Sequence, residues 1–475
     1  MRVAVIHFHL RRGGVTRVIE TAAEALREHG VDLLVLGGEA PGTLDLPPEQ
    51  VTVVSRLNYR EAFSIEAARL LKSDLEAAAR NQWGSLPDIW HVHNHSLAKN
   101  LEVPWVVARW AEEGQRLLLQ PHDFAEDGRP DNYRKLQQAD GLLDHLYPTG
   151  SSVLYGLLNS RDRHLLNAAG VNPAQTVPLP NSVKGFDMSA APIDLNQFGA
   201  ERMILYPSRS IRRKNVGELL LHAAIADHGT KFGCTLAPEN PTAKAIYERW
   251  VKYAAANSLP VEFNVGPRTG ASLESMMAAA AALITTSVAE GFGLAFLEPW
   301  LAGKQLVGRN LPDITGDFTA TGMNLEGLYT ELPIPLEWLG RDALKQTLQR
   351  EMSVTFDSYQ RPLPAGSVDQ FCEGPTIDFG RLDEPLQERV IEHVTRDVDA
   401  ADQLRSLDLL AGDASLVEDN RTAVRSSFGI SDYGHRLHGH YTRLMKADST
   451  ACDWLDPGRL LDEFLSPERF CLLRT

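Results

Sequence analysis

The chain has 475 residues, 43% of them hydrophobic, which is enough for two or three domains with buried cores. Its formal net charge of −15 argues against nucleic acid and anionic lipid surfaces as partners, because both are bound through basic faces. No uninterrupted apolar run reaches the roughly 20 residues that cross a bilayer, so we expect no stable membrane insertion.

The cysteines and the first residues indicate the compartment. The four cysteines are scattered and form no CxxC pair, which predicts free thiols rather than disulfides or a structural zinc site. The first residues, MRVAVIHFHL, lack a small-residue cleavage site and predict a β-strand rather than a signal peptide. We therefore expect a cytoplasmic globular protein.

Strand and helix patterns alternate along much of the chain. In the first part, strands are predicted at 2–8, 31–38, 88–94 and 116–122, with helices at 16–30 and 100–114. The alternation restarts near residue 204, with strands at 204–210, 231–238, 260–266 and 281–287 and helices at 216–229 and 241–258. Strands separated by helices of this length imply parallel βαβ units. The predicted fold class is α/β, with two Rossmann-like halves joined near residues 184–201.

The alternation is lost after Thr315. Residues 316–415 are rich in Pro, Asp and Glu and contain no strong strand pattern, so we interpret them as an insertion or elaboration. Helical periodicity returns in residues 420–445. The predicted domains are 1–183, 184–315, 316–415 and 416–475.

Two glutamates lie in an apolar stretch, TTSVAEGFGLAFLEPWLAG at 285–303. A buried strand, a glycine turn and the start of a helix are predicted here, and open α/β sheets bind ligands beyond the carboxyl ends of their strands. Glu298 shares a helix face with leucines, where a carboxylate needs donors such as the adjacent hydroxyls of a ribose. The amides at the N-terminus of that helix, freed for close approach by Gly291 and Gly293, suit phosphate or sugar oxygens. The alternative is a helix start with a stray acidic residue.

A basic loop, YPSRSIRRKN at 206–215, follows the strand at 204–210. Arg209 ends that strand, and Lys214 lies five positions later at the entry to a helix. Cations aimed at a departing diphosphate stabilise its growing negative charge. The alternative is a solvated basic loop.

Glycines and histidines follow strands in the first half. Gly13 and Gly14 form a turn that lets the backbone approach a phosphate or an acceptor. Three histidines alternate in DIWHVHNHS at 88–96, which raises the possibility of zinc, but no acidic partner completes a ligand set. The alternative is that these imidazoles are satisfied within the fold.

The two glutamates with seven residues between them, followed by EPWLAG, resemble the E-x7-E motif of retaining GT-B glycosyltransferases. This family 4-like group includes sucrose, trehalose and mannosyl-lipid synthases. The resemblance covers residues 1–315 and roughly 418–446. It implies two Rossmann-like domains facing a cleft, with an acceptor-side domain at 1–183, a donor-nucleotide domain at 184–315 and a C-terminal crossover helix that returns to the first domain.

The resemblance also implies roles for individual residues. Glu298 would hold the ribose, Glu290 would lie near the transferred hexose, and His122 would contact that hexose near the reacting centre. Asn181 lies in PNSV, where Ser182 replaces the usual glycine of the family segment. The implied catalytic residues are Glu290, Arg209, Lys214 and His122; the donor-binding residues are Gly13, Gly14, Gly291, Phe292, Gly293, Leu294 and Glu298; and the acceptor residues are His93 and Asn181.

The implied function is a retaining transfer of a hexose from a nucleotide-diphosphate sugar, the co-substrate, to a small soluble acceptor that bears a hydroxyl. No strand-terminal DxD appears, so we expect no metal and no cofactor. Two alternatives stay open: a non-catalytic sugar-nucleotide sensor, and another GT-B nucleotide-sugar enzyme such as an epimerase. The sequence leaves open the donor base, the hexose, the acceptor and the oligomeric state.

Overall fold

The computed structural model describes residues 1–11, 13–40, 42, 46–448 and 451–474. The chain forms two compact units, which are described separately. Unit 1 contains residues 1–182, 358–361 and 428–466, and unit 2 contains residues 183–357, 362–427 and 467–475. The C-terminal segment predicted for residues 416–475 is therefore divided between the units, since the chain enters unit 1 at Phe428 and leaves it after Ser466.

Unit 1 is built on a seven-stranded sheet with the order β3-β2-β1-β4-β5-β7-β8, in which every pair is parallel. The strands are β1 (Arg2–His7), β2 (Asp32–Gly37), β3 (Val51–Val53), β4 (Ile89–His93), β5 (Leu117–Gln120), β7 (Val153–Leu157) and β8 (Thr176–Pro178). A short antiparallel pair joins β6 (Pro148–Thr149) to β16 (Asp453–Trp454). The helices are α1 (Gly14–Leu26), α2 (Ile65–Trp83), α3 (Glu102–Glu112), α4 (Pro130–Gln138), α5 (Ser160–Ala169), α17 (Ile430–Lys446) and α18 (Pro457–Phe464).

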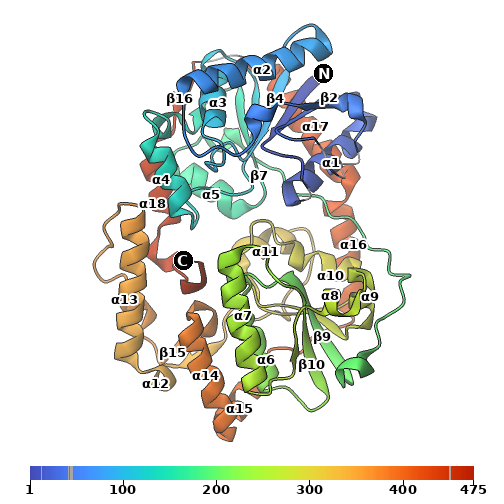
Figure 1. Ribbon diagram of the computed structural model, residues 1–475, viewed down its shortest axis with the longest axis vertical. Coiled ribbons are helices and arrows are strands. Elements are labelled where there is room, and N and C mark those ends of the chain that lie inside the picture. The colour runs from blue at the N-terminus through green and yellow to red at the C-terminus, as the bar shows by residue number, and fades with distance from the viewer. Residues whose placement is uncertain (12, 41, 43–45, 449–450, 475) are drawn as a thin grey trace. The chain divides into compact units, whose positions relative to one another are not determined.

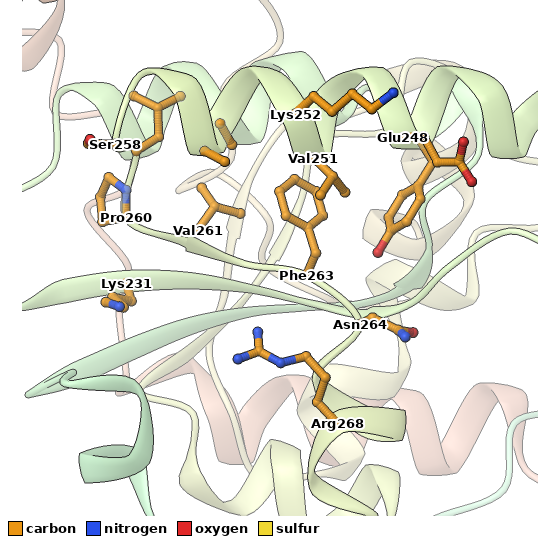
Figure 2. Close-up of a pocket in the computed structure, with 14 residues that line it drawn as sticks. Lys231, Glu248, Val251, Lys252, Ser258, Pro260, Val261, Phe263, Asn264 and Arg268 are labelled. Carbon is orange, nitrogen blue, oxygen red and sulfur yellow. The ribbon is translucent and has the colours of Figure 1, made fainter.

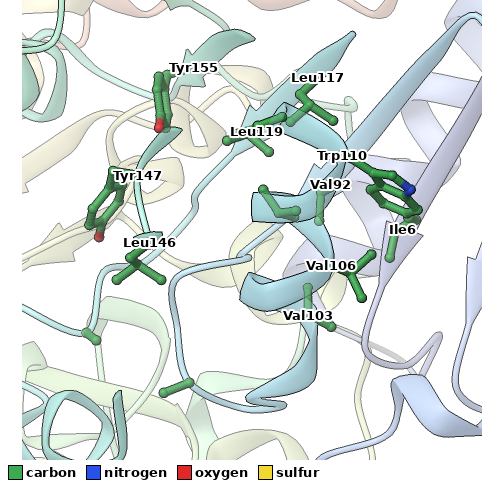
Figure 3. Packing of buried hydrophobic residues seen from close by; sticks show 14 of the residues in the cluster. Ile6, Val92, Val103, Val106, Trp110, Leu117, Leu119, Leu146, Tyr147 and Tyr155 are labelled. Carbon is green, nitrogen blue, oxygen red and sulfur yellow. The ribbon is translucent and has the colours of Figure 1, made fainter. Parts of the chain in front are cut away.

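Both faces of the unit 1 sheet are buried. Along β1, Val3 and Val5 pack into a cluster with residues of α1 and α17, whereas Ala4 and Ile6 pack on the opposite face with residues of α2 and α3. Period-2 alternation between two buried faces explains why the strand sequence is continuously apolar. Figure 3 shows part of the second cluster, with Ile6 of β1 and Trp110 of α3. The Trp110 ring stacks on that of Trp90 in β4, with the ring centroids 3.9 Å apart.

Helix α17 returns late in the chain to cover the first face. It lies beside α1, although more than 400 residues separate their first residues (Figure 1). The close approach depends on Gly434, because a Cβ there would lie 2.9 Å from the Ala25 carbonyl oxygen. The phenol of Tyr441, on the same helix, hydrogen-bonds His91 Nδ1 at 2.8 Å, which ties α17 to β4.

Unit 2 has a five-stranded parallel sheet with the order β11-β10-β9-β12-β13. Its strands are β9 (Arg202–Arg209), β10 (Thr230–Leu236), β11 (Val261–Glu262), β12 (Ala282–Thr285) and β13 (Leu306–Gly308). The first helices are α6 (Val216–Ala224), α7 (Pro241–Ala256), α8 (Val265–Thr269), α9 (Leu273–Ala279), α10 (Glu298–Leu301) and α11 (Pro312–Thr319). Ile204 and Tyr206 pack on one face of β9, and Met203 and Leu205 pack on the other, as in a doubly wound sheet.

The segment 316–415 folds largely as part of unit 2. It contains the second half of α11 and the helices α12 (Leu336–Leu339), α13 (Arg341–Ser358), α14 (Glu384–Arg396) and α15 (Val398–Arg405). It also contains the antiparallel pair β14 (Pro333–Pro335) and β15 (Thr376–Asp378), and it precedes α16 (Leu416–Phe428). Leu344 and Leu348 of α13 and Val390 and Ile391 of α14 join the same buried cluster as Ile204.

Among the described residues, no helix has the length and apolar character needed to cross a membrane.

Candidate active site

In unit 2, the loops after two neighbouring strands meet. Strand β9 leads into residues 210–215, and β12 leads into residues 286–293. Glu290 is 8% exposed, and its carboxylate accepts hydrogen bonds from Lys214 Nζ and, at 3.1 Å, from Arg213 Nη1. The structure therefore brings together the two predicted catalytic residues Glu290 and Lys214, and it adds Arg213 as a second cation.

Side chains from both strands hold these loops in place. The hydroxyl of Thr286 donates to the carbonyl oxygens of Lys214 and Asn215 at 2.9 and 3.0 Å. The phenol of Tyr206 reaches the Lys214 carbonyl oxygen at 3.1 Å and the Ser287 hydroxyl at 2.8 Å. The backbone that presents Lys214 is thus fastened directly to the loop that presents Glu290. Tyr206, Thr286 and Ser287 were not predicted as functional residues, although they lie beside the two motifs in the sequence.

The buried charges of this site depend on one another. Burial by itself raises the pKa of Glu290, but the charges of Lys214 and Arg213 outweigh it and lower that pKa. Burial lowers the pKa of Lys214, against the opposing attraction of Glu290. The Glu298 carboxylate also acts to raise the Lys214 pKa, so both glutamates of the motif act electrostatically on the same ammonium group. Glu298 itself is partly exposed.

The glycine turn between the two glutamates is sterically required. Gly293 has φ of 99°, and a Cβ there would lie 2.9 Å from Ile314 Cγ2. Phe292 is buried, with its ring against Phe318 at a centroid distance of 5.7 Å. The Phe292 contact therefore fastens the turn to α11, and Gly293 leaves room for Ile314 of that helix.

The helix predicted after this turn is much shorter than expected. Residues 294–296 form a single 3-10 turn, and α10 spans only Glu298–Leu301, with Pro299 in its first turn. Proline is compatible with a helix only there, because its ring removes a donor and clashes with the preceding turn. The amides that follow the turn therefore do not lie at the N-terminus of a long helix as predicted, and the four residues of α10 build up little dipole to attract an anion.

The other arginines of the basic loop point elsewhere. Arg209 forms an exposed ion pair with Glu239 at 2.5 Å. Arg212 is held by both oxygens of Glu384, at 2.7 and 2.9 Å. Of the predicted pair Arg209 and Lys214, only Lys214 reaches Glu290 in this structure.

The predicted residues of unit 1 lie at the carboxyl end of its sheet. His93 ends β4, and His122 follows β5, so the two imidazoles meet with His93 Nδ1 2.9 Å from His122 Nε2. Gly13 precedes α1 with an extended backbone, and Gly14 begins that helix. A Cβ at Gly14 would meet no described atom within 4 Å, so crowding in the described chain does not explain this glycine. Asn181 follows β8, and its Oδ1 is buried without a hydrogen-bond partner in the described chain.

These imidazoles are neutral at physiological pH. Burial, with a smaller contribution from His91, lowers the pKa of His122 to about 3, and burial lowers that of His91 to about 4. Burial and the neighbouring histidines also hold the His93 pKa well below its usual value. No group of three or more potential metal ligands occurs among the described residues. Neutral imidazoles suit hydrogen bonds with sugar hydroxyls.

A buried carboxyl group lies four residues after His122. Burial raises the pKa of Glu126 to about 7, and the Tyr147 phenol donates to its two oxygens at 3.1 and 3.0 Å. The pKa is higher in the folded chain than the ordinary value of 4.5, so ionisation costs folding free energy as the pH rises from 4.5 to 7. Below that interval the cost is absent, and above it the cost is constant.

Glu126→Gln is therefore expected to stabilise unit 1 at pH 8 by about 3 kcal/mol more than at pH 4, the free-energy equivalent of this pKa difference. Urea unfolding at the two pH values measures the effect. Glu61→Gln is the matched control, since the Glu61 side chain is 87% exposed. Equal pH dependence in Glu126→Gln and the wild type would contradict the assignment.

A cavity of about 670 Å³ lies in unit 2 away from these loops. Figure 2 shows it between α7 and the edge strand β11, with Val251, Val261 and Phe263 among its lining residues. Neither Lys214 nor Glu290 lines it. The candidate site is therefore defined by the paired loops and not by this cavity.

No protein-family model matches the chain. A curated relative is mannosylglucosyl-3-phosphoglycerate synthase of Petrotoga mobilis, 24% identical over 347 residues. The match covers 66% of this chain and 66% of that protein, so it spans just under two thirds of the relative's length.

Two solved structures are similar over nearly the whole chain. HepE of Anabaena in complex with UDP-glucose has a TM-score of 0.51 at 14% identity, covering 93% of this chain and 99% of that chain. Sucrose-phosphate synthase of Thermosynechococcus elongatus has a TM-score of 0.50 at 15% identity, covering 93% and 98%. This likeness confirms the predicted fold: two Rossmann-like α/β domains of the GT-B type.

Proposed function

We propose that the protein is a glycosyltransferase that takes a hexose from a nucleotide-diphosphate sugar. The observation that carries the proposal is the buried contact of Glu290 with Lys214 and Arg213 at the carboxyl ends of β9 and β12. Carboxyl ends of parallel strands are where this class of fold binds nucleotides. The glycosyl-transferring relative and the GT-B structure containing UDP-glucose support the same class of donor.

In the proposed reaction the bond between the anomeric carbon and the diphosphate oxygen breaks. The acceptor hydroxyl oxygen bonds to that carbon, and the hydroxyl proton passes to the departing diphosphate or to solvent. Lys214 and Arg213 would stabilise the negative charge that develops on the diphosphate, so no metal ion is needed for that task. Glu298 would accept hydrogen bonds from the ribose hydroxyls, and Glu290 would hold the cations toward the hexose side.

We further propose a retaining, family 4-like enzyme, as the E-x7-E resemblance implies. We also propose a cytoplasmic location, because the scattered cysteines favour a reducing compartment. We propose a small soluble acceptor bound mainly by unit 1, where the neutral His122 would hydrogen-bond a hydroxyl of the hexose. The name of the Petrotoga mobilis relative, mannosylglucosyl-3-phosphoglycerate synthase, contains a 3-phosphoglycerate group, which supports an acceptor of this size.

The proposal is tested by incubating the protein with UDP-, GDP- and ADP-hexoses and a cell extract that supplies acceptors. Mass spectrometry should detect a product heavier by one hexose, with release of the nucleoside diphosphate. Binding of a donor without turnover or hydrolysis would instead identify a sensor. Conversion of the donor to an isomer without transfer would identify an epimerase. Proton NMR of the new anomeric centre would show whether configuration is retained.

Glu298→Ala is expected to weaken binding of the nucleoside diphosphate about tenfold to a hundredfold, because hydroxyl donors would lose a charged acceptor. The value of kcat at saturating donor should change much less. Isothermal titration calorimetry and initial rates measure the two effects. Glu337→Ala is the control, since Glu337 is exposed on α12. A fall in kcat with unchanged affinity would contradict a ribose-binding role.

A further inference from the structure

The segment that showed no functional pattern in the sequence contacts the loop that carries Lys214. Helix α14 begins at Glu384, and Asp383 caps it by accepting a hydrogen bond from the Leu386 amide at 3.0 Å. This cap fixes the first turn of the helix. Glu384 and Gln387 are three residues apart, so they lie on the same face of that turn. Both side chains contact residues 212–215.

Glu384 holds the start of the loop. Its two carboxylate oxygens accept hydrogen bonds from Arg212 Nε and Nη2 at 2.7 and 2.9 Å, a bidentate arrangement. Glu384 is buried, whereas the Arg212 side chain is partly exposed. Bidentate pairing restricts the orientation of the guanidinium as well as its position, so it constrains the backbone that carries Arg212.

Gln387 holds the end of the loop. Its Nε2 donates to Asn215 Oδ1 at 2.8 Å, and both side chains are almost completely buried. Asn215 has φ of 52°, a left-handed conformation that links the loop to α6. A Cβ on Gly217 would lie 2.0 Å from Gln387 Oε1, so the glycine leaves room for this contact. Asn215 Nδ2 in turn donates to Glu218 at 2.7 Å.

We infer that Glu384 and Gln387 are positioning residues that hold residues 212–215, through Arg212 and Asn215, in the conformation that directs Lys214 toward the donor diphosphate. The role toward the diphosphate rests on the proposed function. The restraint on residues 212–215 does not, because its contacts are present in the protein without a ligand. The hydrophobic residues of α14, including Val390 and Ile391, contribute its packing in the core. Removing either polar contact should therefore loosen the loop while leaving the core of unit 2 intact.

The first test is hydrogen exchange of the free protein. The Lys214 and Asn215 amides donate to the carbonyl oxygens of Ile211 and Arg212, both at 2.9 Å. In Glu384→Ala and Gln387→Ala, amides of residues 212–217 should exchange at least about tenfold faster, while those of β9 and β12 keep wild-type protection. Glu388→Ala is the control, since Glu388 lies on the same helix but pairs with Arg249 at 2.6 Å. Unchanged exchange in the loop, or equal acceleration throughout unit 2, overturns the inference.

The second test asks whether the restraint serves diphosphate recognition. The measured quantity is the Kd of the nucleoside monophosphate divided by the Kd of the diphosphate, for the nucleoside that binds best; it reports how much the second phosphate adds to binding. This ratio should fall about tenfold in Glu384→Gln, which keeps the side-chain shape but removes the charge. Arg212→Ala should have the same effect, and the double variant no more than either alone, because they share one contact. An unchanged ratio overturns the positioning role.

The two proposals can fail independently. If the wild type binds no nucleoside diphosphate, the proposed function fails, whereas faster loop exchange still supports the restraint. If the wild type transfers a hexose and the loop exchange is insensitive to Glu384 and Gln387, the restraint fails and the proposed function stands.

Discussion

Lys214→Ala is expected to lower kcat by about 10²–10³-fold, since one cation aimed at a developing negative charge contributes on this scale. The KM for the acceptor should change little, because the proposed role of Lys214 concerns the diphosphate. Initial rates at saturating donor and varied acceptor measure both quantities. The variant leaves Glu290 buried beside Arg213, so its melting temperature must be recorded to show that it remains folded.

Lys345→Ala is the matched control for Lys214→Ala. Lys345 pairs with Asp369 on the surface of unit 2, where both side chains are about half exposed. Its replacement should leave kcat within twofold of the wild type, because exposed ion pairs contribute little. Comparable losses in the two variants, or a wild-type kcat in Lys214→Ala, would contradict the proposed role of the buried lysine.

Arg309→Met is expected to destabilise unit 2 by about 3–5 kcal/mol, because it leaves two carboxylates without their buried cation. Arg309 is 3% exposed, and it donates to Glu218 and Asp378 at distances of 2.6 to 3.2 Å. Glu218 would keep hydrogen bonds from Tyr329 and Asn215, but these supply no full charge. Urea unfolding followed by tryptophan fluorescence measures the change in unfolding free energy.

Arg350→Met provides the comparison for Arg309→Met. Arg350 pairs with Glu351 on α13, and its side chain is 65% exposed. The expected change is within about 0.5 kcal/mol, since water replaces the exposed contact. If the two substitutions cost the same, the buried network does not hold the segment 329–378 to the sheet, and the account of Arg309 is wrong.

The sequence predicted the fold because each sheet buries both faces. Val3, Ala4, Val5 and Ile6 are all apolar because alternate residues of β1 enter the buried clusters on opposite faces of the sheet. A helix between two strands of one sheet carries the chain back to the starting edge, so the two strands run parallel. Element ends were less predictable. The strand expected at 260–266 contains only Val261–Glu262, because the chain turns at Asn264 into α8.

The candidate site was partly predictable from its motifs. Lys214 and Glu290 each follow a strand, and the carboxyl ends of adjacent parallel strands share one edge of a sheet. Which arginine joins them was not predictable from spacing. A register shift in β10 between Cys234 and Leu236 places Leu236 opposite Arg209 in the sheet. The Arg209 side chain forms an ion pair with Glu239 instead of contacting Glu290. The contact of Lys214 with Glu290 is observed, but the proposed roles of both residues, and those of Arg209, Glu298 and His122, stay predictions.

Apolar periodicity and motif spacing are local properties of the chain, so they were enough to predict the two parallel α/β domains and the strand-end positions of the acidic and basic motifs. The pairing of Arg213 with Lys214 at Glu290, and the contacts of Glu384 and Gln387 with a loop more than 160 residues away, became visible only in the folded chain. Such contacts depend on how distant segments pack in three dimensions. A buried carboxylate or amide needs a hydrogen-bond partner, but the sequence does not show which distant residue that partner will be.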